Sequence, residues 1–234
     1  MVRLLVVLAA LCAASPAAAQ CRLALILALD VSSSVDGRED RLQRDGLAGA
    51  LLSPEIVAAF LETPETPVAL AVYEWSGRYQ QHRILDWTVM DSRAAILGAA
   101  EAIGGSTRSF SEFPTAVGYA IGHAATVFRD GPDCLFRTLD LSGDGVNNEG
   151  FGPLLAYRHF PLDDVTVNGL AIGGAAQGDK DLFEFFRNDV IKGPGAFVEI
   201  ARNYDDFERA MRRKLLRELR ARVIGELDGA DTRG

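Results

Sequence analysis

Three oxygen-bearing side chains stand at alternate positions after a short apolar run of this sequence. The run covers residues 23–29, and it is followed by Asp30, Ser32 and Ser34. This alternation allows one carboxylate and two hydroxyls to converge from one side of a tight loop. Such oxygens are hard ligands, which suit Mg²⁺ or Mn²⁺ better than zinc. The residue types therefore predict a divalent-cation site for Mg²⁺ or Mn²⁺, with Ca²⁺ less favoured.

The same stretch is also typical of a strand that runs into the start of a helix. Ser and Asp are common at helix N-caps and in turns, because their side chains bond nearby backbone N–H groups. Asp36 is expected to begin the first helix, where its negative charge favours the helix dipole. Taken alone, residues 30–36 leave the metal and turn interpretations open.

A buried strand is the element expected to position Asp30. An unbroken apolar run bounded by a polar turn predicts a strand that is covered on both faces. Charges interspersed in residues 83–89 favour an edge strand there. The predicted strands cover residues 23–29, 68–75, 83–89, 135–141, 165–172 and 196–200. The predicted helices cover residues 36–52, 91–103, 115–128, 150–160, 179–190 and 204–227.

This alternation predicts an α/β fold: a doubly wound, mostly parallel six-stranded sheet, in the order 3-2-1-4-5-6, with helices on both faces. In that order the first and fourth strands are neighbours. The fourth strand runs into Ser142-Gly143-Asp144-Gly145. Asp144 should therefore reach the same edge of the sheet as Asp30, where open α/β sheets bind ligands.

The amino-terminal residues are typical of a secretory signal. Arg3 precedes an apolar segment, and three alanines ending at Ala19 form a small-residue cleavage site. We expect residues 1–19 to be removed and residues 20–234 to form a single domain, periplasmic or secreted. No other segment is long and apolar enough to predict a stable membrane span. The formal net charge of −8, which becomes −9 without Arg3, argues against nucleic acid as a partner.

Two cysteines remain after the signal, which is an even count for an exported protein. Cys21 and Cys134 each come immediately before an apolar strand-like run. If those two strands are parallel neighbours, both cysteines lie at the same edge of the sheet. We therefore expect a disulfide between them.

The sequence Asp30-Val31-Ser32-Ser33-Ser34 resembles the D-x-S-x-S motif of von Willebrand factor type A domains. The resemblance extends over nearly the whole mature chain, and most closely to an exported proteobacterial branch of that family. It implies a metal-ion-dependent adhesion site (MIDAS), to which a second loop adds a threonine and a third adds an aspartate. Asp144 matches that aspartate, although Gly143 stands where many relatives carry threonine.

Two threonines compete for the position on the second loop. Thr115 is expected to open the helix over residues 115–128, from which its hydroxyl could point at a ligand. Thr107 is the alternative if residues 108–114 are an insertion. The resemblance thus assigns the metal ligands to Asp30, Ser32, Ser34, Thr115 and Asp144.

The function implied is that of a metal-dependent protein-binding module and not of an enzyme, with no catalytic residues. A protein partner supplies an acidic residue that completes the metal shell. The alternative is a Mg²⁺-dependent hydrolase or phosphoryl-transfer enzyme at the same sheet edge, since such sites also gather Asp and Ser. Asp140 is a candidate for orienting a site group or for capping an edge. The basic residues of 204–227 are expected to form the solvated face of a packed helix.

Overall fold

We describe the computed structural model over residues 21–173 and 179–230, and over their side chains except those of 179–180 and 221–230. The expected signal at residues 1–19 lies outside this part of the chain. The strands are β1 (Cys21–Asp30), β2 (Val68–Trp75), β3 (Gln81–Val89), β4 (Cys134–Gly143), β5 (Val165–Ile172) and β6 (Val198–Ala201). The helices are α1 (Gly37–Leu52), α2 (Pro54–Phe60), α3 (Arg93–Gly104), α4 (Val117–Arg129), α5 (Pro153–His159), α6 (Asp179–Phe185) and α7 (Phe207–Ala230).

The six strands form one sheet in the order β3-β2-β1-β4-β5-β6, which confirms the predicted topology. All neighbouring strands are parallel except β2 and β3, which are antiparallel. The strand with interspersed charges, β3, lies at one edge of the sheet, as predicted. Strand β1 is central and buried along its whole length, because its apolar side chains are covered on both faces. Cys21 and Cys134 are register partners on β1 and β4, and they form the expected disulfide.

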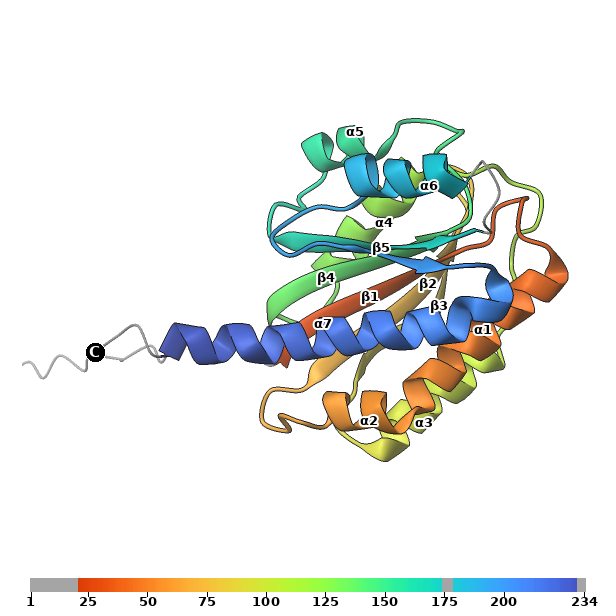
Figure 1. Cartoon of the computed structure of the whole chain (residues 1–234). Coiled ribbons are helices and arrows are strands. Elements are labelled where there is room, and N and C mark those ends of the chain that lie inside the picture. The colour runs from red at the N-terminus through yellow and green to blue at the C-terminus, as the bar shows by residue number, and fades with distance from the viewer. Residues whose placement is uncertain (1–20, 174–178, 231–234) are drawn as a thin grey trace, which may run out of the picture.

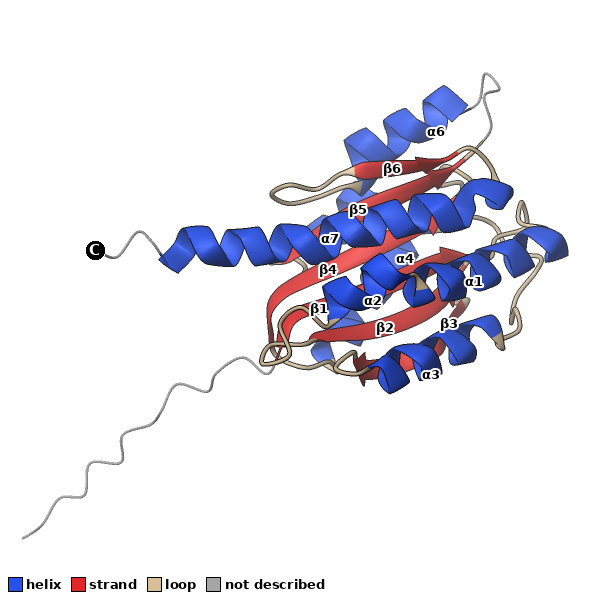
Figure 2. Cartoon of the chain, turned by 60° about the horizontal axis from the view of Figure 1, so that its bottom comes forward, coloured by secondary structure: helices blue, strands red, loops and turns tan. Residues whose placement is uncertain are grey.

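Alternate side chains of β1 enter two separate cores. Leu23, Leu25, Leu27 and Leu29 pack in one core with α1, α2, α3 and α7. The intervening Ala24, Ile26 and Ala28 pack in the other core with α4 and α5. Figures 1 and 2 show these two helical layers, with the sheet between them. The carboxyl ends of β1 and β4 therefore lie at the same edge of a sheet that has a hydrophobic core on each face.

Several helix boundaries depart from the sequence prediction: α5 begins at Pro153 and not at residue 150, and α7 begins at Phe207 and not at residue 204. Helix α4 begins at Val117, with Ala116 as its N-cap, so Thr115 lies in the preceding loop. Helix α6 continues as a π-helical turn over Phe186–Val190 where an uninterrupted α-helix was expected. Asp36 caps α1 as predicted, accepting hydrogen bonds from two backbone amides and forming a capping box with Glu39.

Helix α7 lies across the sheet over β4 and β5, as Figure 2 shows. Its apolar side chains at helical spacing, Phe207, Met211, Leu215 and Leu219, are buried in the core. Lys214 is also fully buried, so the prediction of a wholly solvated basic face is wrong at this residue. Among the described residues, no helix is long and apolar enough to cross a membrane.

Candidate metal site

The carboxylate of Asp30 is fully buried at the end of β1. Its Oδ1 accepts a hydrogen bond of 2.8 Å from the backbone N–H of Ser32. Its Oδ2 has no hydrogen-bond partner among the described residues. A Cβ placed on Gly143 would stand 3.0 Å from this oxygen, so the glycine leaves the space that the carboxylate occupies. A buried carboxylate oxygen is costly without a partner, so Oδ2 is suited to a proton or a cation.

The environment of Asp30 favours the neutral form of its carboxyl. Burial, and next the charge of Asp144, raise the pKa of Asp30 to about 7, while hydrogen bonds from Ser32 oppose the shift. A divalent cation would reverse this preference, because it stabilises both carboxylates at once. The site is therefore electrostatically unfavourable to two bare carboxylates and favourable to a carboxylate pair with a cation.

A chain of hydrogen bonds connects the two serines to Asp144. The hydroxyls of Ser32 and Ser34 are 3.1 Å apart, and Ser34 Oγ donates to Asp144 Oδ1 at 2.6 Å. Asp144 directly follows β4, the strand that pairs with β1. The structure thus brings together Asp30, Ser32, Ser34 and Asp144 from two neighbouring strand ends.

Thr115 approaches this group from the loop before α4. The Thr115 backbone N–H donates to Asn148 Oδ1 at 2.8 Å, and its carbonyl accepts from the Asn148 N–H at 2.9 Å. These bonds hold Thr115 against the loop that carries Asp144. A Cβ on Gly145 would stand 3.4 Å from Thr115 Oγ1, and the threonine is 4% exposed. No hydrogen bond among the described residues joins its hydroxyl to the other four side chains.

The alternative ligand, Thr107, is exposed to solvent. Its neighbour Arg108 instead contacts the loop of residues 31–35 that follows β1, which we call the metal loop. Sequence patterns did not indicate this contact. Arg108 donates three hydrogen bonds, to the backbone carbonyls of Val31, Ser32 and Val35, at 2.7–2.8 Å. A single guanidinium therefore holds the loop that presents Ser32 and Ser34. Arginine suits this role because its planar group carries five donors in fixed directions.

Further buried polar contacts hold the end of β1 and the segment that follows Arg108. Gln43 on α1 donates to the backbone carbonyl of Asp30 at 2.9 Å. Glu74 on β2 pairs with Arg44 inside the protein and also accepts the backbone N–H of Ser109. Glu74 is the one charged residue in the otherwise apolar run of residues 68–75. Because a buried charge must be paired, its position in the sequence indicates a buried cationic partner, which is Arg44 in the structure.

Tyr204 is a second residue of the site that sequence patterns did not single out. It precedes α7 in a 3-10 turn (Tyr204–Asp206), and its side chain is buried. Burial, followed by the charges of Asp144, Asp30 and Glu39, raises the pKa of its phenol. The Tyr204 phenol therefore stays neutral and lies close enough to Asp30 and Asp144 to be affected by their charges. Because Tyr204 directly precedes α7, the start of this helix lies near the candidate metal ligands.

Asp140 does not take part in this site. Its buried carboxylate is 2.8 Å from Lys214 Nζ on α7, and Lys214 also donates to Glu218 Oε1 at 2.7 Å. Burial raises the pKa of Asp140 to about 7, with Lys214 acting against the shift and Glu218 reinforcing it. Asp140 therefore connects the sheet to α7 and neither orients a metal ligand nor caps an edge.

The five predicted ligands fit a hard divalent cation. They offer two carboxylates and three hydroxyls, all of them oxygen donors, and one carboxylate oxygen is buried without a partner. Among the described residues, no three His, Cys, Asp or Glu side chains gather in a way that could hold a metal. A cation would thus depend on the hydroxyls as well as the two aspartates. Two carboxylates also match a divalent charge.

The sheet order, with loops carrying these side chains after β1 and β4, defines the fold of a von Willebrand factor type A domain. A solved type A structure from Catenulispora acidiphila is 16% identical, with a TM-score of 0.59, over 85% of this chain and 43% of its own. Proximal thread matrix protein 1 of the mussel byssus, solved with a zinc-occupied MIDAS motif, is 16% identical, with a TM-score of 0.59, over 87% of this chain and 49% of its own. The pilus adhesin SpaC of Lactobacillus rhamnosus GG is 11% identical, with a TM-score of 0.58, over 85% of this chain and 31% of its own.

At these identities the likeness concerns the fold, and this chain spans less than half of each of those three proteins. The chain belongs to the family described as "Protein of unknown function (DUF1194)", whose model matches residues 20–223. Among curated proteins, no sequence matches the chain.

Proposed function

We propose that this protein is an exported, metal-dependent protein-binding module. Asp30, Ser32, Ser34, Thr115 and Asp144 hold Mg²⁺ or Mn²⁺ at the carboxyl edge of the sheet. The observation that carries the proposal is the unpartnered Oδ2 of buried Asp30, which stands beside a hydrogen-bonded group of Ser32, Ser34 and Asp144. The solved neighbour with a zinc-occupied MIDAS motif supports a divalent cation in this fold in general terms.

The cation supplies a Lewis-acidic position for an oxygen ligand from outside the chain. We propose that an acidic side chain of a protein partner takes this position, as the resemblance to type A domains implies. The protein's own residues hold the loops in place: Arg108 fixes the backbone of residues 31–35, and Asn148 fixes Thr115. Residues 20–234 act as one domain in this proposal. The disulfide supports export after cleavage near Ala19, to the periplasm or beyond, because disulfides persist in oxidising compartments.

Calorimetric titration of Mg²⁺ and Mn²⁺ into protein beginning at Gln20 tests the metal site. Saturable binding is expected in the wild type and not in Asp30→Ala or Asp144→Ala. Asp45→Ala is the matched control, because Asp45 is an exposed carboxylate elsewhere on α1. Binding that persists in both site variants, or that is absent from the folded wild type, would contradict the proposed site.

A turnover assay separates binding from the competing enzyme hypothesis. The same proteins are incubated with p-nitrophenyl phosphate and Mg²⁺, and release of p-nitrophenol is followed. No release above the Asp30→Ala background is expected for a binding module. Turnover that requires Asp30 would favour the Mg²⁺-dependent hydrolase instead.

A further inference from the structure

The segment of residues 108–114 is attached to the metal loop near both of its ends. Arg108, its first residue, donates to three backbone carbonyls of the metal loop. Near the other end of the segment, the carbonyl of Phe113 accepts the backbone N–H of Ser33 at 2.8 Å. Ser33 stands between two candidate ligands of the cation. The segment is therefore held against the loop that presents those ligands before any partner binds.

Phe113 lies close to the candidate metal ligands on two sides. It bonds to the metal loop through Ser33, and Thr115 follows it by two residues, a length of chain that spans at most about 7 Å. Both Ser33 and Thr115 are thus within reach of a molecule that touches Phe113. Although its backbone is held in this way, Phe113 is 38% exposed. A large apolar side chain is therefore presented to solvent directly beside the proposed cation.

Phe113 belongs to a group of aromatic side chains from two loops. Its ring packs edge to face with that of Phe110, with the ring centroids 5.9 Å apart, and we call these two residues the aromatic pair. The turn after β2 lies beside the pair, because a Cβ at Gly77 would stand 3.3 Å from Phe113 Cβ. Tyr79 in that turn is 82% exposed. Exposed aromatic residues held on fixed loops are typical of binding surfaces, since they offer a large contact area at a low cost in conformational entropy.

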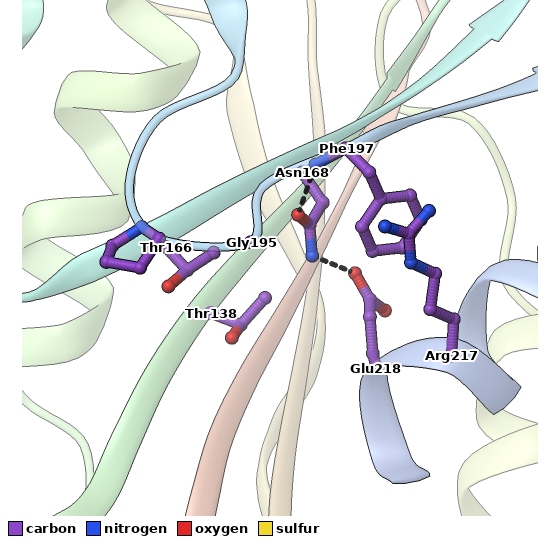
Figure 3. A pocket seen from close by; sticks show the side chains of 8 residues that line it. Thr138, Thr166, Asn168, Gly195, Phe197, Arg217 and Glu218 are labelled. Carbon is purple, nitrogen blue, oxygen red and sulfur yellow. Dashed lines mark hydrogen bonds between the residues drawn. The ribbon is translucent and has the colours of Figure 1, made fainter. Parts of the chain in front are cut away.

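A contrasting aromatic residue lies in the pocket between α7 and the sheet (Figure 3). There the guanidinium of Arg217 stacks on Phe197, with its carbon 3.8 Å from the ring centroid, and Phe197 is buried. The neighbouring Glu218 accepts hydrogen bonds from Asn168 and from the same helix. Phe197 is thus covered by a side chain of the protein itself, whereas Phe113 is open to solvent.

We propose that the aromatic pair binds an aromatic side chain that stands directly next to the partner's acidic residue in sequence. This inference rests on the proposed function and specifies its partner as a protein segment with adjacent acidic and aromatic residues. Adjacent residues are expected because neighbouring Cα atoms are only about 3.8 Å apart, which matches the closeness of Phe113 to the candidate ligands. An aromatic ring is expected because it adds favourable edge-to-face geometry to the apolar contact with Phe110 and Phe113.

NMR titration of ¹⁵N-labelled protein beginning at Gln20, saturated with Mg²⁺, tests this inference. The probes are two acetylated dipeptide amides, phenylalanyl-aspartate and aspartyl-phenylalanine, and their counterparts with alanine in place of phenylalanine. At least one phenylalanine peptide should bind about tenfold more tightly than its alanine counterpart, as expected for burying a phenyl ring on an aromatic surface. Equal affinities within both pairs of peptides would overturn the inference, as would a phenylalanine peptide that binds equally well in EDTA.

The same titrations separate this inference from the proposed function. Saturable binding of Mg²⁺ and of the alanine peptides, with no gain from phenylalanine, would refute the aromatic contact and leave the metal-dependent module in place. No binding of Mg²⁺, or of any of the four peptides to Mg²⁺-saturated protein, would contradict the proposed function and this inference together.

Variants then assign the gain to the aromatic pair. Phe113→Ser and Phe110→Ser should each reduce the gain from phenylalanine, and Phe113→Tyr should retain it. The Kd for Mg²⁺ is measured for each variant, because it reports whether the metal loop keeps its bond to the carbonyl of residue 113. Leu135→Ser is the matched control, since Leu135 is an exposed apolar residue near the beginning of β4, at the opposite end of that strand from Asp144. A gain that survives both serine substitutions in the pair, or that Leu135→Ser removes equally, would overturn the assignment.

Discussion

Gly143 lies against the buried carboxylate of Asp30, so closely that a Cβ at position 143 would stand 3.0 Å from Asp30 Oδ2. The glycine ends β4, the strand next to the one that Asp30 ends. The Asp30 carboxylate occupies the space that a side chain at position 143 would need, which makes the position sensitive to any substitution.

We expect Gly143→Ala to weaken Mg²⁺ binding by about tenfold, because the added methyl group displaces Asp30 at an overpacking cost of ~1–3 kcal/mol. Calorimetric titration measures the change. Gly98→Ala is the control, since a Cβ at Gly98 meets no atom within 4 Å. An unchanged Kd for Gly143→Ala would show that Asp30 tolerates the contact without moving away from the cation.

Asp30 should make the metal-free protein less stable as the pH rises. Its pKa is about 7 in the folded protein and about 3.9 in an unfolded chain, so the folded state holds the extra proton between these values. The contribution of Asp30 to the free energy of unfolding is present below pH 4 and is lost as the pH rises through 7. The total loss is up to ~4 kcal/mol, from three pKa units at 1.36 kcal/mol each.

Urea denaturation in EDTA at pH 5 and pH 8 measures this effect. Asp30→Asn stays neutral at both pH values. The free energy of unfolding of this variant, relative to that of the wild type, should therefore be higher at pH 8 than at pH 5. Mg²⁺ at pH 8 should restore the wild type and leave Asp30→Asn unaffected. Equal differences between the two proteins at both pH values would mean that Asp30 is already ionised at pH 5.

Removal of the Arg108 side chain should loosen the metal loop. Arg108→Ala deletes three hydrogen bonds to the carbonyls of Val31, Ser32 and Val35, at a cost of ~1–3 kcal/mol in unfolding free energy. Hydrogen exchange of peptides covering residues 31–36 should accelerate, and Mg²⁺ should bind more weakly. Arg129→Ala, which removes an exposed arginine paired with its neighbour Asp130, should change neither quantity. Unaltered exchange at residues 31–36 would rule out a positioning role for Arg108.

Lys214 is expected to be essential for stability, because it is the cation between two buried carboxylates. Lys214→Met should lower the free energy of unfolding by ~3–5 kcal/mol at pH 8, as for other broken buried ion pairs. The triple variant with Asp140→Asn and Glu218→Gln should recover much of this loss, because no unpaired charge remains. Urea denaturation tests both; a single variant as stable as wild type would show that Lys214 contributes no net stabilisation.

The strand framework was predictable because its signals are local. The runs of residues 23–29, 68–75 and 165–172 are buried along their whole length, as expected for strands of a sheet that is covered on both faces. Their order placed Cys21 beside Cys134, and the disulfide confirms that expectation. The same order brings Asp30 and Asp144 to one edge, where their loops contact each other.

The supporting residues depend on contacts between segments far apart in sequence, which local patterns do not reveal. Arg108 lies in a loop without periodicity, yet it bonds a loop more than seventy residues away. Lys214 belongs to a basic helix in which sequence alone does not distinguish the buried cation from the exposed ones. Thr115 was expected at the first turn of α4, but its bonds to Asn148 hold it two residues before the helix begins.

The disulfide has a mechanical consequence. Tension applied between Cys21 and any residue after Cys134 passes directly through the covalent bond that joins the two cysteines. The 113-residue separation between them is bypassed, so the backbone from 22 to 133 carries none of that load. Asp30, Ser32, Ser34 and Thr115 all lie within this unloaded loop, whereas Asp144, which directly follows β4, lies on the loaded side. A pull that unravels the segments after β4 would therefore separate Asp144 from the other four candidate ligands and leave the segment that carries those four unloaded.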